Sequence, residues 1–178
     1  MQHEPVFKLA LEECNTAFKN FVDWDIFEEL DKTENHRLEE IDVVQPLLVA
    51  IEIALAKLWQ SKGVQPNAVI GHSMGEVAAA YIANIISLDD AAKIICYRSS
   101  LMKQASGKGA MLATDLSLNE VQEIVNVNNG VAIAVVNSLN SLVLSGNKEL
   151  VHQIQQDLEN KGKFAKLVKV DVASHSNH

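Results

Sequence analysis

The sequence predicts an α/β protein in two parts, and three observations predict it. A short apolar run that stops at a glycine is followed at once by a helical run, the pattern of a strand, a tight turn and a helix. Amphipathic helical stretches flank this pattern on both sides. From Gly109 onward the apolar residues follow the order strand, helix, strand, strand, helix, strand. We therefore expect an incomplete α/β layer formed by residues 1–107 and 171–178, and an inserted lobe formed by residues 108–170.

The composition excludes several classes of partner. The 178 residues are 48% hydrophobic, and the net charge of −8 comes without a cluster of Lys and Arg, which argues against nucleic acid and anionic membranes. The two cysteines, Cys14 and Cys96, lie in helical patterns and do not form a disulfide framework. No apolar run has membrane-spanning length, and the N-terminus lacks the apolar segment of a signal peptide. We expect a cytoplasmic protein.

Two helices and a short helical turn between them are expected before the strand-turn-helix pattern. Apolar residues recur at the i, i+3, i+4 spacing over residues 5–21, and a further short turn of helix is expected over residues 24–30. Asp42 opens a long helix that should end near Gly63, because glycine favours helix C-termini. Gln45 stands where it can close a capping box with Asp42, and Pro46 falls in the first turn, where its missing N–H costs little.

The stretch Gly71-His72-Ser73-Met74-Gly75 fits the G-x-S-x-G pattern of a nucleophile elbow, the strained turn of α/β-hydrolase-like layers. A strand over residues 68–70 should precede it and a helix over residues 76–83 should follow it. The glycines allow the chain to reverse closely, and the first amide groups of the helix point toward the serine's reaction partner. Ser73 is the candidate nucleophile. The alternative is a glycine-rich turn whose serine has no catalytic function.

A capping box from Ser87 to Asp90 begins a helix that we expect to reach about Ser106. Arg98 occupies a position in the apolar stripe of this helix, and no acidic residue stands three or four positions away to neutralise it. Burying an unpaired charge is costly. Arg98 therefore binds an anionic ligand group or a distant carboxylate, or buries only its stem while the guanidinium reaches water.

The second part of the chain consists of short elements. Strands are expected over residues 110–114, 131–136, 142–144 and 164–170. One helix is capped by Ser117 and runs to about Val127, and another is capped by Asn147 and ends near Lys161. The order β-α-β-β-α-β is that of a ferredoxin-like lobe. The last strand leads into residues 172–175, which should return the chain to a cleft between the two lobes.

A serine hydroxyl needs a neighbouring base, and the sequence has six histidines. Five occupy unsuitable places: His3 and His36 in polar segments, His72 in the turn itself, His152 on a polar helix and His178 at the last residue. His175 follows a strand end, as a positioned base would. His175 and His178 also have a spacing that metal ligands use, but no third ligand stands nearby, and we expect no metal.

Six motifs, taken in order, resemble one family. They are Asp42-Val-Val-Gln-Pro46, Gly71-His-Ser-Met-Gly-Glu76, Tyr97-Arg-Ser-Ser100, Gly109-Ala-Met111, Val136-Asn-Ser138 and Val172-Ala-Ser-His-Ser176. The series is similar to the acyltransferase domain of type I polyketide synthases, which is related to bacterial malonyl-CoA:acyl-carrier-protein transacylase. The resemblance runs from about Pro5 to the last residue.

The resemblance implies the catalytic roles. Ser73 would be acylated, and His175 would be its base, oriented by backbone carbonyl groups. Arg98 would pair with the free carboxylate of a malonyl-type group, for which its two-pronged guanidinium is suited. Met74 would supply an oxyanion-hole N–H from its backbone.

The resemblance also implies residues that line the substrate site. Gln45 and Asn137 match polar residues of that site, although a helix cap and a turn position explain them equally well. His72 is a further candidate beside the nucleophile. Val172 and Ser174 belong to a segment that correlates with the extender unit in the family, where a Phe in place of Ser174 goes with malonyl and a Tyr-Ala-Ser-His version goes with methylmalonyl. Here the segment matches neither pattern, so both extender units stay open.

The implied reaction is a ping-pong acyl transfer in polyketide or fatty acid biosynthesis. Ser73, deprotonated by His175, attacks an acyl-coenzyme A, coenzyme A leaves, and an acyl-serine ester remains. The phosphopantetheine thiol of an acyl carrier protein then collects the acyl group. No bound cofactor is implied. The partners would be the carrier protein and neighbouring polyketide synthase domains such as a ketosynthase.

Two departures from the family pattern reduce the expected activity. The glutamine-containing strand that supplies a second oxyanion N–H in the family has no counterpart before Pro5, and the chain stops at His178 where family members continue. We expect the isolated chain to be weakly active or inactive, because losing one oxyanion donor costs on the order of a hundredfold in rate.

Two other functions stay open. A serine hydrolase or thioesterase of the α/β-hydrolase class shares the elbow and needs an acid between serine and histidine, for which Asp115 and Asp171 are available. That interpretation leaves Arg98 unexplained. A non-catalytic fragment would dock a carrier protein or a neighbouring domain without forming an acyl adduct.

Overall fold

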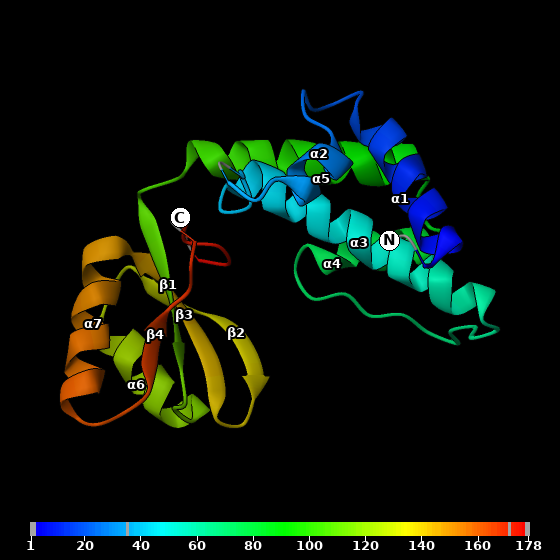
Figure 1. The fold of residues 1–178 in the computed structure, drawn as a ribbon. Coiled ribbons are helices and arrows are strands. Elements are labelled where there is room, and N and C mark those ends of the chain that lie inside the picture. Colours follow the sequence, from blue (N-terminus) through cyan, green and yellow to red (C-terminus); the bar gives the residue numbers. More distant parts are fainter. Residues whose placement is uncertain (1–2, 35, 171, 177–178) are drawn as a thin grey trace. The chain divides into compact units, whose positions relative to one another are not determined.

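A computed structural model describes residues 3–34, 36–170 and 172–176 (Figure 1). These residues belong to two compact units, Met1–Lys103 and Gln104–His178, each with a hydrophobic core of its own. Residues 172–176, which the sequence analysis assigns to the first layer, fall in the second unit. Asp171 and His178 lie outside the described residues.

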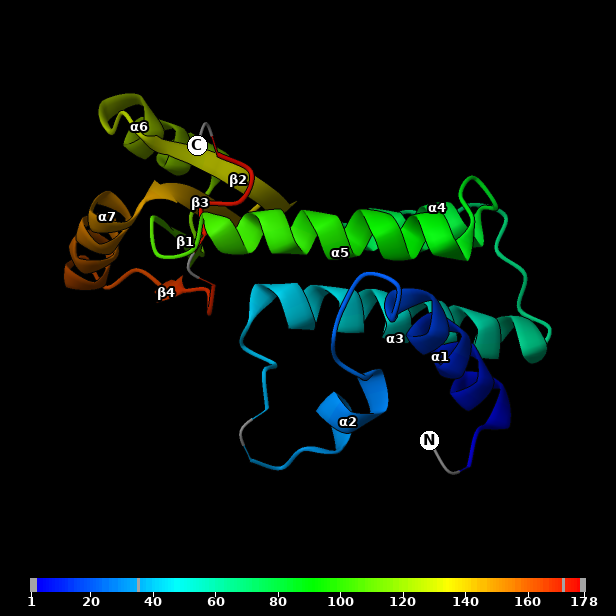
Figure 2. The ribbon, with the colours of Figure 1, turned by 90° about the horizontal axis from the view of Figure 1, so that it is seen from above.

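Among its described residues, the regular elements of the first unit are all helices. Its elements are α1 (Pro5–Phe18), α2 (Ile26–Asp31), α3 (Ile41–Ser61), α4 (Gly75–Ile82) and α5 (Leu88–Gln104). Their apolar faces share one core, in which Leu11, Ile53 and Ile95 are at most 1% exposed. Figure 2 shows α1 packed across the long helix α3.

The strand predicted over residues 68–70 is not present. This segment is irregular, and Ile70 is 96% exposed. A strand is stabilised by hydrogen bonds to a neighbouring strand, and the four strands found among the described residues all pair within the second unit. The apolar run therefore has the composition of a strand without the partner that would make it one.

The start of α3 also differs from the prediction. The helix begins at Ile41 with Glu40 as its N-cap residue, and no side chain caps it. Asp42 is therefore inside the first turn, where its Oδ2 binds Nζ of Lys103 at 2.9 Å, and Pro46 lies inside the helix beyond that turn. The capping box proposed for Asp42 and Gln45 is wrong. The box proposed for α5 is confirmed, because Asp90 N donates to Ser87 Oγ at 3.1 Å and Ser87 N to Asp90 Oδ2 at 3.3 Å.

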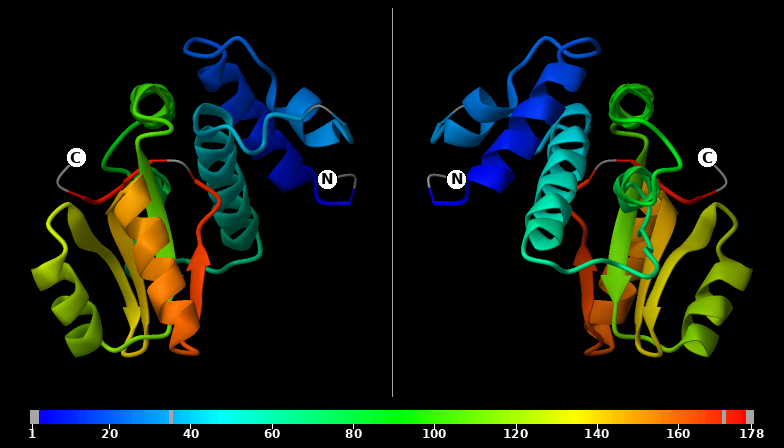
Figure 3. Two further views of the ribbon diagram at one scale, coloured as in Figure 1. Left: turned by 90° about the vertical axis from the view of Figure 1, so that its left-hand side faces the viewer. Right: turned by 90° about the vertical axis from the view of Figure 1, so that its right-hand side faces the viewer.

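The second unit is an antiparallel sheet with two helices. Its elements are β1 (Gly109–Thr114), α6 (Leu118–Val127), β2 (Val131–Ser138), β3 (Ser141–Asn147), α7 (Lys148–Asn160) and β4 (Ala165–Leu167). The strand order is β2-β3-β1-β4, and every neighbouring pair is antiparallel. Both helices cover the same face of the sheet (Figure 3). Ser117 and Asn147 cap α6 and α7 as the sequence predicts.

The core of the second unit lies between this sheet face and the two helices. Leu112 of β1 pairs with Leu144 of β3, and both are fully buried together with Val121 of α6 and Val151 of α7. The edge strand β4 is shorter than the predicted run over residues 164–170, because only residues 165–167 of that run are in register with β1. No helix in the part of the chain that the structure describes is long and apolar enough to cross a lipid bilayer.

Candidate active site

The elbow residues form a tight turn at the start of α4. Ser73 has a φ of +53°, in the left-handed region that residues with a side chain rarely adopt. Gly75 N donates to His72 O at 3.0 Å, and Glu76 N donates to Ser73 O at 3.1 Å. The turn is thus hydrogen-bonded directly into the first turn of the helix, and the backbone of Ser73 moves with the N-terminus of α4.

The two glycines of the elbow differ in what surrounds them. A Cβ at Gly71 would lie 2.3 Å from the backbone N and Cα of Glu76, closer than atoms can approach. A Cβ at Gly75 would lie 3.6 Å from both carboxylate oxygens of Glu52, which is an ordinary contact distance. Gly71 is therefore required by close backbone approach, whereas Gly75 faces a polar side chain from α3.

Met74 is the N-cap residue of α4 and has helical backbone angles. Its amide belongs to the end of the helix at which N–H groups carry partial positive charge. This is the location at which the sequence analysis places an oxyanion donor. His72 precedes the serine, its carbonyl oxygen takes part in the turn, and the residue is exposed.

Arg98 of α5 reaches the elbow. Its Nη2 lies 3.5 Å from Ser73 Oγ, and its Nη1 donates a hydrogen bond to Oε1 of Gln45 on α3. Gln45 therefore orients the guanidinium instead of capping its own helix. The structure brings together three of the residues predicted from sequence: Ser73, Arg98 and Gln45.

The charge of Arg98 has neutral partners in this arrangement. Burial lowers the pKa of its guanidinium, because the surrounding protein withdraws water from the charged form. No ion pair within the described ranges joins Arg98 to a carboxylate of the protein. A half-buried guanidinium with a hydrogen-bonding side chain behind it and a serine in front of it is suited to an anionic ligand.

Arg98 does not lie inside a buried stripe, contrary to the prediction. The buried face of α5 consists of Ala91, Ala92, Ile95, Cys96 and Ser99. Ile94 and Leu101, which the sequence analysis assigns to that stripe, are 44% and 63% exposed. Arg98 is half-buried and shares their side of the helix. Helical spacing alone cannot distinguish a core face from an apolar face left uncovered by the described residues.

Glu52 is a residue at this site that the sequence analysis missed. It lies on α3 seven residues after Gln45, a separation that places two side chains on the same side of a helix. Its carboxylate faces Gly75 at the start of α4. The seven-residue spacing from Gln45 can be read from the sequence, but it does not predict a role for Glu52 unless the position of α4 is known.

The remaining candidates belong to the second unit. Ser174 and His175 lie in a turn after β4, in which Ser176 Oγ donates to Ala173 O at 2.7 Å and His175 is exposed with a φ of +58°. This turn packs on the start of β1, since a Cβ at Gly109 would lie 2.4 Å from Ala173. The pairing of His175 with the serine of the first unit stays a prediction.

Two further residues of the second unit were predicted to line the substrate site. Val172 is 3% exposed and belongs to the interior, so it supports the turn that carries His175. Asn137 lies near the end of β2 and is exposed. Their contact with a substrate stays a prediction.

The two cysteine thiols and the possible metal ligands among the described residues differ from what a nucleophile or a metal site requires. Burial raises the pKa of the Cys14 and Cys96 thiols to about 12, so both are neutral at physiological pH and unsuited to attack. Within the described ranges, His, Cys, Asp and Glu do not gather in groups of three that could hold a metal ion.

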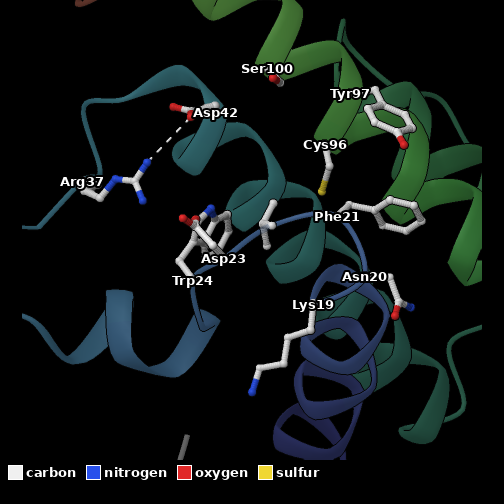
Figure 4. Close-up of a pocket in the computed structure, with 11 residues that line it drawn as sticks. Lys19, Asn20, Phe21, Asp23, Trp24, Arg37, Asp42, Cys96, Tyr97 and Ser100 are labelled. Carbon is white, nitrogen blue, oxygen red and sulfur yellow. Dashed lines mark ion pairs between the residues drawn. The ribbon is translucent and has the colours of Figure 1, made fainter.

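A hollow of about 470 Å³ opens beside α5 (Figure 4). With about 3.6 residues per turn, the α5 residues that line it lie on the other side of the helix from Arg98. It is lined by residues 19–24, Arg37, Asp42, Cys96, Tyr97 and Ser100. Arg37 Nη2 and Asp42 Oδ2 face each other there at 3.7 Å. None of the candidate catalytic residues is among those that line it, so the hollow is separate from the serine and its arginine.

Comparison with protein families gives one match over the whole chain. The family described as "Acyl transferase domain" matches residues 1–178. The chain is 42% identical over 176 residues to the polyketide synthase GfsB of Streptomyces halstedii. These residues make up 98% of this chain and 3% of that protein. It is 40% identical over 174 residues to the pikromycin polyketide synthase component PikAII of Streptomyces venezuelae, covering 97% and 5% respectively.

Solved structures give a consistent result. The acyltransferase domain from module 8 of the salinomycin polyketide synthase superposes with a TM-score of 0.90 at 39% identity, covering 97% of this chain and 41% of that one. A loading acyltransferase from the avermectin modular polyketide synthase superposes with a TM-score of 0.91 at 35% identity, covering 97% and 56%. The chain therefore spans about half the length of these structures or less.

Proposed function

The chain belongs to the family of acyl transferase domains of modular polyketide synthases, and we propose on that basis that it transfers a malonyl-type acyl group through an ester on Ser73. The donor would be an acyl-coenzyme A and the acceptor the phosphopantetheine thiol of an acyl carrier protein. One observation carries the proposal: the guanidinium of Arg98 lies 3.5 Å from Ser73 Oγ and is held by Gln45, with no carboxylate of the described chain to neutralise it.

The first half-reaction forms the ester. Ser73 Oγ attacks the thioester carbonyl carbon while His175 accepts its proton, and the C–S bond breaks to release coenzyme A, which takes the proton from His175. The negative charge on the carbonyl oxygen develops near the amide of Met74, at the N-terminus of α4, where partial positive charge stabilises it. The strained turn presents the hydroxyl to the substrate.

The second half-reaction transfers the acyl group. The carrier protein's thiol gives its proton to His175 and attacks the ester carbonyl carbon, and the C–O bond to Ser73 breaks with return of the proton to Oγ. Coenzyme A and the carrier protein are substrates here, so the proposal needs no bound cofactor and no metal.

Arg98 sets the class of acyl group. A guanidinium binds a carboxylate with two parallel hydrogen bonds. Malonyl and methylmalonyl carry a free carboxylate, whereas an acyl group such as acetyl does not. Gln45 fixes the direction of the guanidinium before substrate arrives, which reduces the ordering that binding must impose. His72 stands beside the nucleophile as a further substrate contact in this proposal.

The second unit supplies the remaining parts of the proposal. Its element order and its sheet order β2-β3-β1-β4 support a ferredoxin-like lobe, which would bring His175, Ser174 and Asn137 to the acyl group, with the buried Val172 supporting the turn that carries His175. A related structure contains a type II polyketide synthase carrier protein in complex with its malonyl-transacylase, which supports a carrier protein as partner here. A ketosynthase neighbour, a role in fatty acid synthesis and a cytoplasmic location belong to the same proposal.

Intact-protein mass spectrometry tests the proposal. After exposure to malonyl-CoA or methylmalonyl-CoA, the wild-type protein should carry one acyl group, and Ser73→Ala should carry none. Arg98→Ala should lose at least about tenfold in loading rate with these donors and should lose less with acetyl-CoA, because only the carboxylated donors use the guanidinium. An acyl group that persists in Ser73→Ala would refute the nucleophile, and equal losses with all donors would refute the role of Arg98.

For the serine-hydrolase alternative, Asp115 is the candidate acid among the described residues. Its Oδ1 accepts a hydrogen bond from Phe164 N at 3.2 Å, between the segments that follow β1 and precede β4 in the second unit. The other proposed acid, Asp171, lies outside the described residues. A docking fragment without catalysis would show carrier-protein binding unchanged in Ser73→Ala and no acyl group in the wild type.

A further inference from the structure

The carboxyl group of Glu52 lies directly against the first residue of the elbow helix. The three atoms nearest to a Cβ on Gly75 all belong to this carboxyl group, with both oxygens at 3.6 Å and the carboxyl carbon at 3.9 Å. Gly75 has no side chain, and these distances leave room for a methyl group but not for a larger side chain between its backbone and the carboxyl group. The carboxyl group therefore lies beside the start of α4.

The burial of this carboxyl group is energetically unfavourable. Glu52 Oε2 is buried and has no hydrogen-bond partner within the described part of the protein. Burial raises the pKa of Glu52, since water is withdrawn from the charged form. A buried polar atom without a partner costs free energy that an apolar side chain of similar size would not. Stability of the fold alone does not explain a glutamate at this position.

Helix α3 contributes residues beside both Arg98 and the turn that carries Ser73. Gln45 and Glu52 lie on the same side of α3, about 10 Å apart along its axis. Gln45 holds the guanidinium of Arg98, and Glu52 contacts Gly75, two residues after Ser73. Hydrogen bonds from Gly75 N to His72 O and from Glu76 N to Ser73 O join that glycine to the serine. Helix α3 therefore contacts both the arginine and the turn that carries the serine.

We propose that Glu52 is a positioning residue: its carboxyl group sets where α4 begins and so places Ser73 Oγ relative to Arg98. The inference rests on the proposed function, in which Ser73 is acylated beside Arg98. Small displacements of a reacting group have large effects on rate, since misplacement by about 1 Å can cost on the order of a hundredfold. Loss of the Glu52 contact should lower the rate of Ser73 acylation without changing donor binding.

A double-mutant cycle tests the contact. Glu52→Ala removes the carboxyl group, and Gly75→Val extends a side chain beyond the Cβ position, which is 3.6 Å from the carboxylate oxygens, into the space that the carboxyl group occupies. We expect each single variant to lower kcat of Ser73 acylation about tenfold with KM for malonyl-CoA unchanged, and the double variant to be about tenfold slower instead of about a hundredfold, because both changes break one contact. Each rate is expressed per folded protein, with the folded fraction measured by circular dichroism.

Two further variants separate positioning from stability. Glu52→Gln keeps the shape and an acceptor oxygen and should stay within about threefold of wild type. Glu28→Ala, an exposed glutamate on α2, should not change the rate. Additive losses in the double variant, or a fall in melting temperature with kcat per folded molecule unchanged, would overturn the role of Glu52. If the wild type forms no acyl-Ser73, the proposed function fails and the role of Glu52 fails with it. If the wild type is acylated and the losses are additive, only the role of Glu52 fails.

Discussion

Gly71 is the single residue on which the shape of the elbow depends most directly. Its backbone passes so close to Glu76 that any Cβ would overlap the N and Cα atoms at 2.3 Å. The neighbouring atoms are backbone atoms of a helix, which cannot move aside as a flexible side chain can. The left-handed backbone of Ser73, with φ of +53°, is retained because this packing determines it.

We predict that Gly71→Ala destabilises the first unit by about 2 kcal/mol or more, through overpacking against backbone. Urea unfolding monitored by tryptophan fluorescence measures the change, since both tryptophans, Trp24 and Trp59, lie in this unit. Gly75→Ala is the matched control. It meets only ordinary contacts and gains helix propensity, so it should be neutral in stability or slightly stabilising. Equal changes in the two variants would show that the overlap at Gly71 makes no contribution of its own to the loss.

At the scale of elements, a network of charged side chains joins the segment before α3 to the last turn of α5. Lys103 Nζ binds Glu40 Oε2 at 2.6 Å and Asp42 Oδ2 at 2.9 Å. Arg37 donates to both carboxylate oxygens of Glu40, at 3.1 and 3.2 Å. These partners lower the pKa of Glu40 from 4.5 to about 2, the hydrogen bonds from Arg37 contributing most.

The lowered pKa of Glu40 determines how stability changes with pH. A carboxyl group whose pKa is lower in the folded state stabilises the fold above its unfolded pKa, and this contribution is lost as the pH falls toward the folded pKa. The free energy of unfolding should therefore decrease between about pH 5 and pH 2. Denaturant titrations at several pH values should show a smaller decrease in Glu40→Gln than in wild type.

Glu39→Gln is the control for this measurement. Glu39 is the exposed neighbour of Glu40, so its substitution changes the net charge equally without removing the pairing with Arg37 and Lys103. Its pH dependence should follow that of wild type. A Glu40→Gln profile parallel to wild type would contradict a stabilising role for the network.

At the scale of the whole molecule, the chain contains two separate cores. The core of the first unit is formed by α1, α3 and α5 among others, and the core of the second lies between its sheet and the helices α6 and α7. Each buries residues that are fully inaccessible, such as Leu11 in the first and Leu144 in the second. Because each unit has a core of its own, unfolding of one does not require unfolding of the other.

We predict that Leu144→Ala destabilises the second unit by about 2–5 kcal/mol, the cost of a cavity at a fully buried leucine. Circular dichroism reports helices and strands of both units, whereas tryptophan fluorescence reports the first unit only. The dichroism transition should therefore broaden or divide, with the fluorescence midpoint unchanged. Leu139→Ala, at a leucine that is 89% exposed, should alter neither probe. Equal shifts of both probes in Leu144→Ala would show that the two units unfold as one.

The sequence by itself determined the features whose physical causes lie within a few residues of one another. The capping box of Ser117 and Glu120 spans four residues, the amphipathic pattern of a helix repeats every three or four residues, and the G-x-S-x-G turn spans five residues. The motifs from Gln45 to His175 were sufficient to indicate the family, which the comparisons show. Such patterns act through neighbours along the chain, so they can be read without coordinates.

Only the tertiary structure decided which distant groups meet. It gave Gln45 a partner 53 residues away in place of the predicted cap, brought Glu52 against Gly75, and left the apolar run before the elbow without a strand to pair with. It also moved Arg98 from an expected buried stripe to a half-buried position beside Ser73. The physical reason is that hydrogen-bond partners and burial depend on how separate helices pack against one another, and the spacing of residues within one helix does not contain that information.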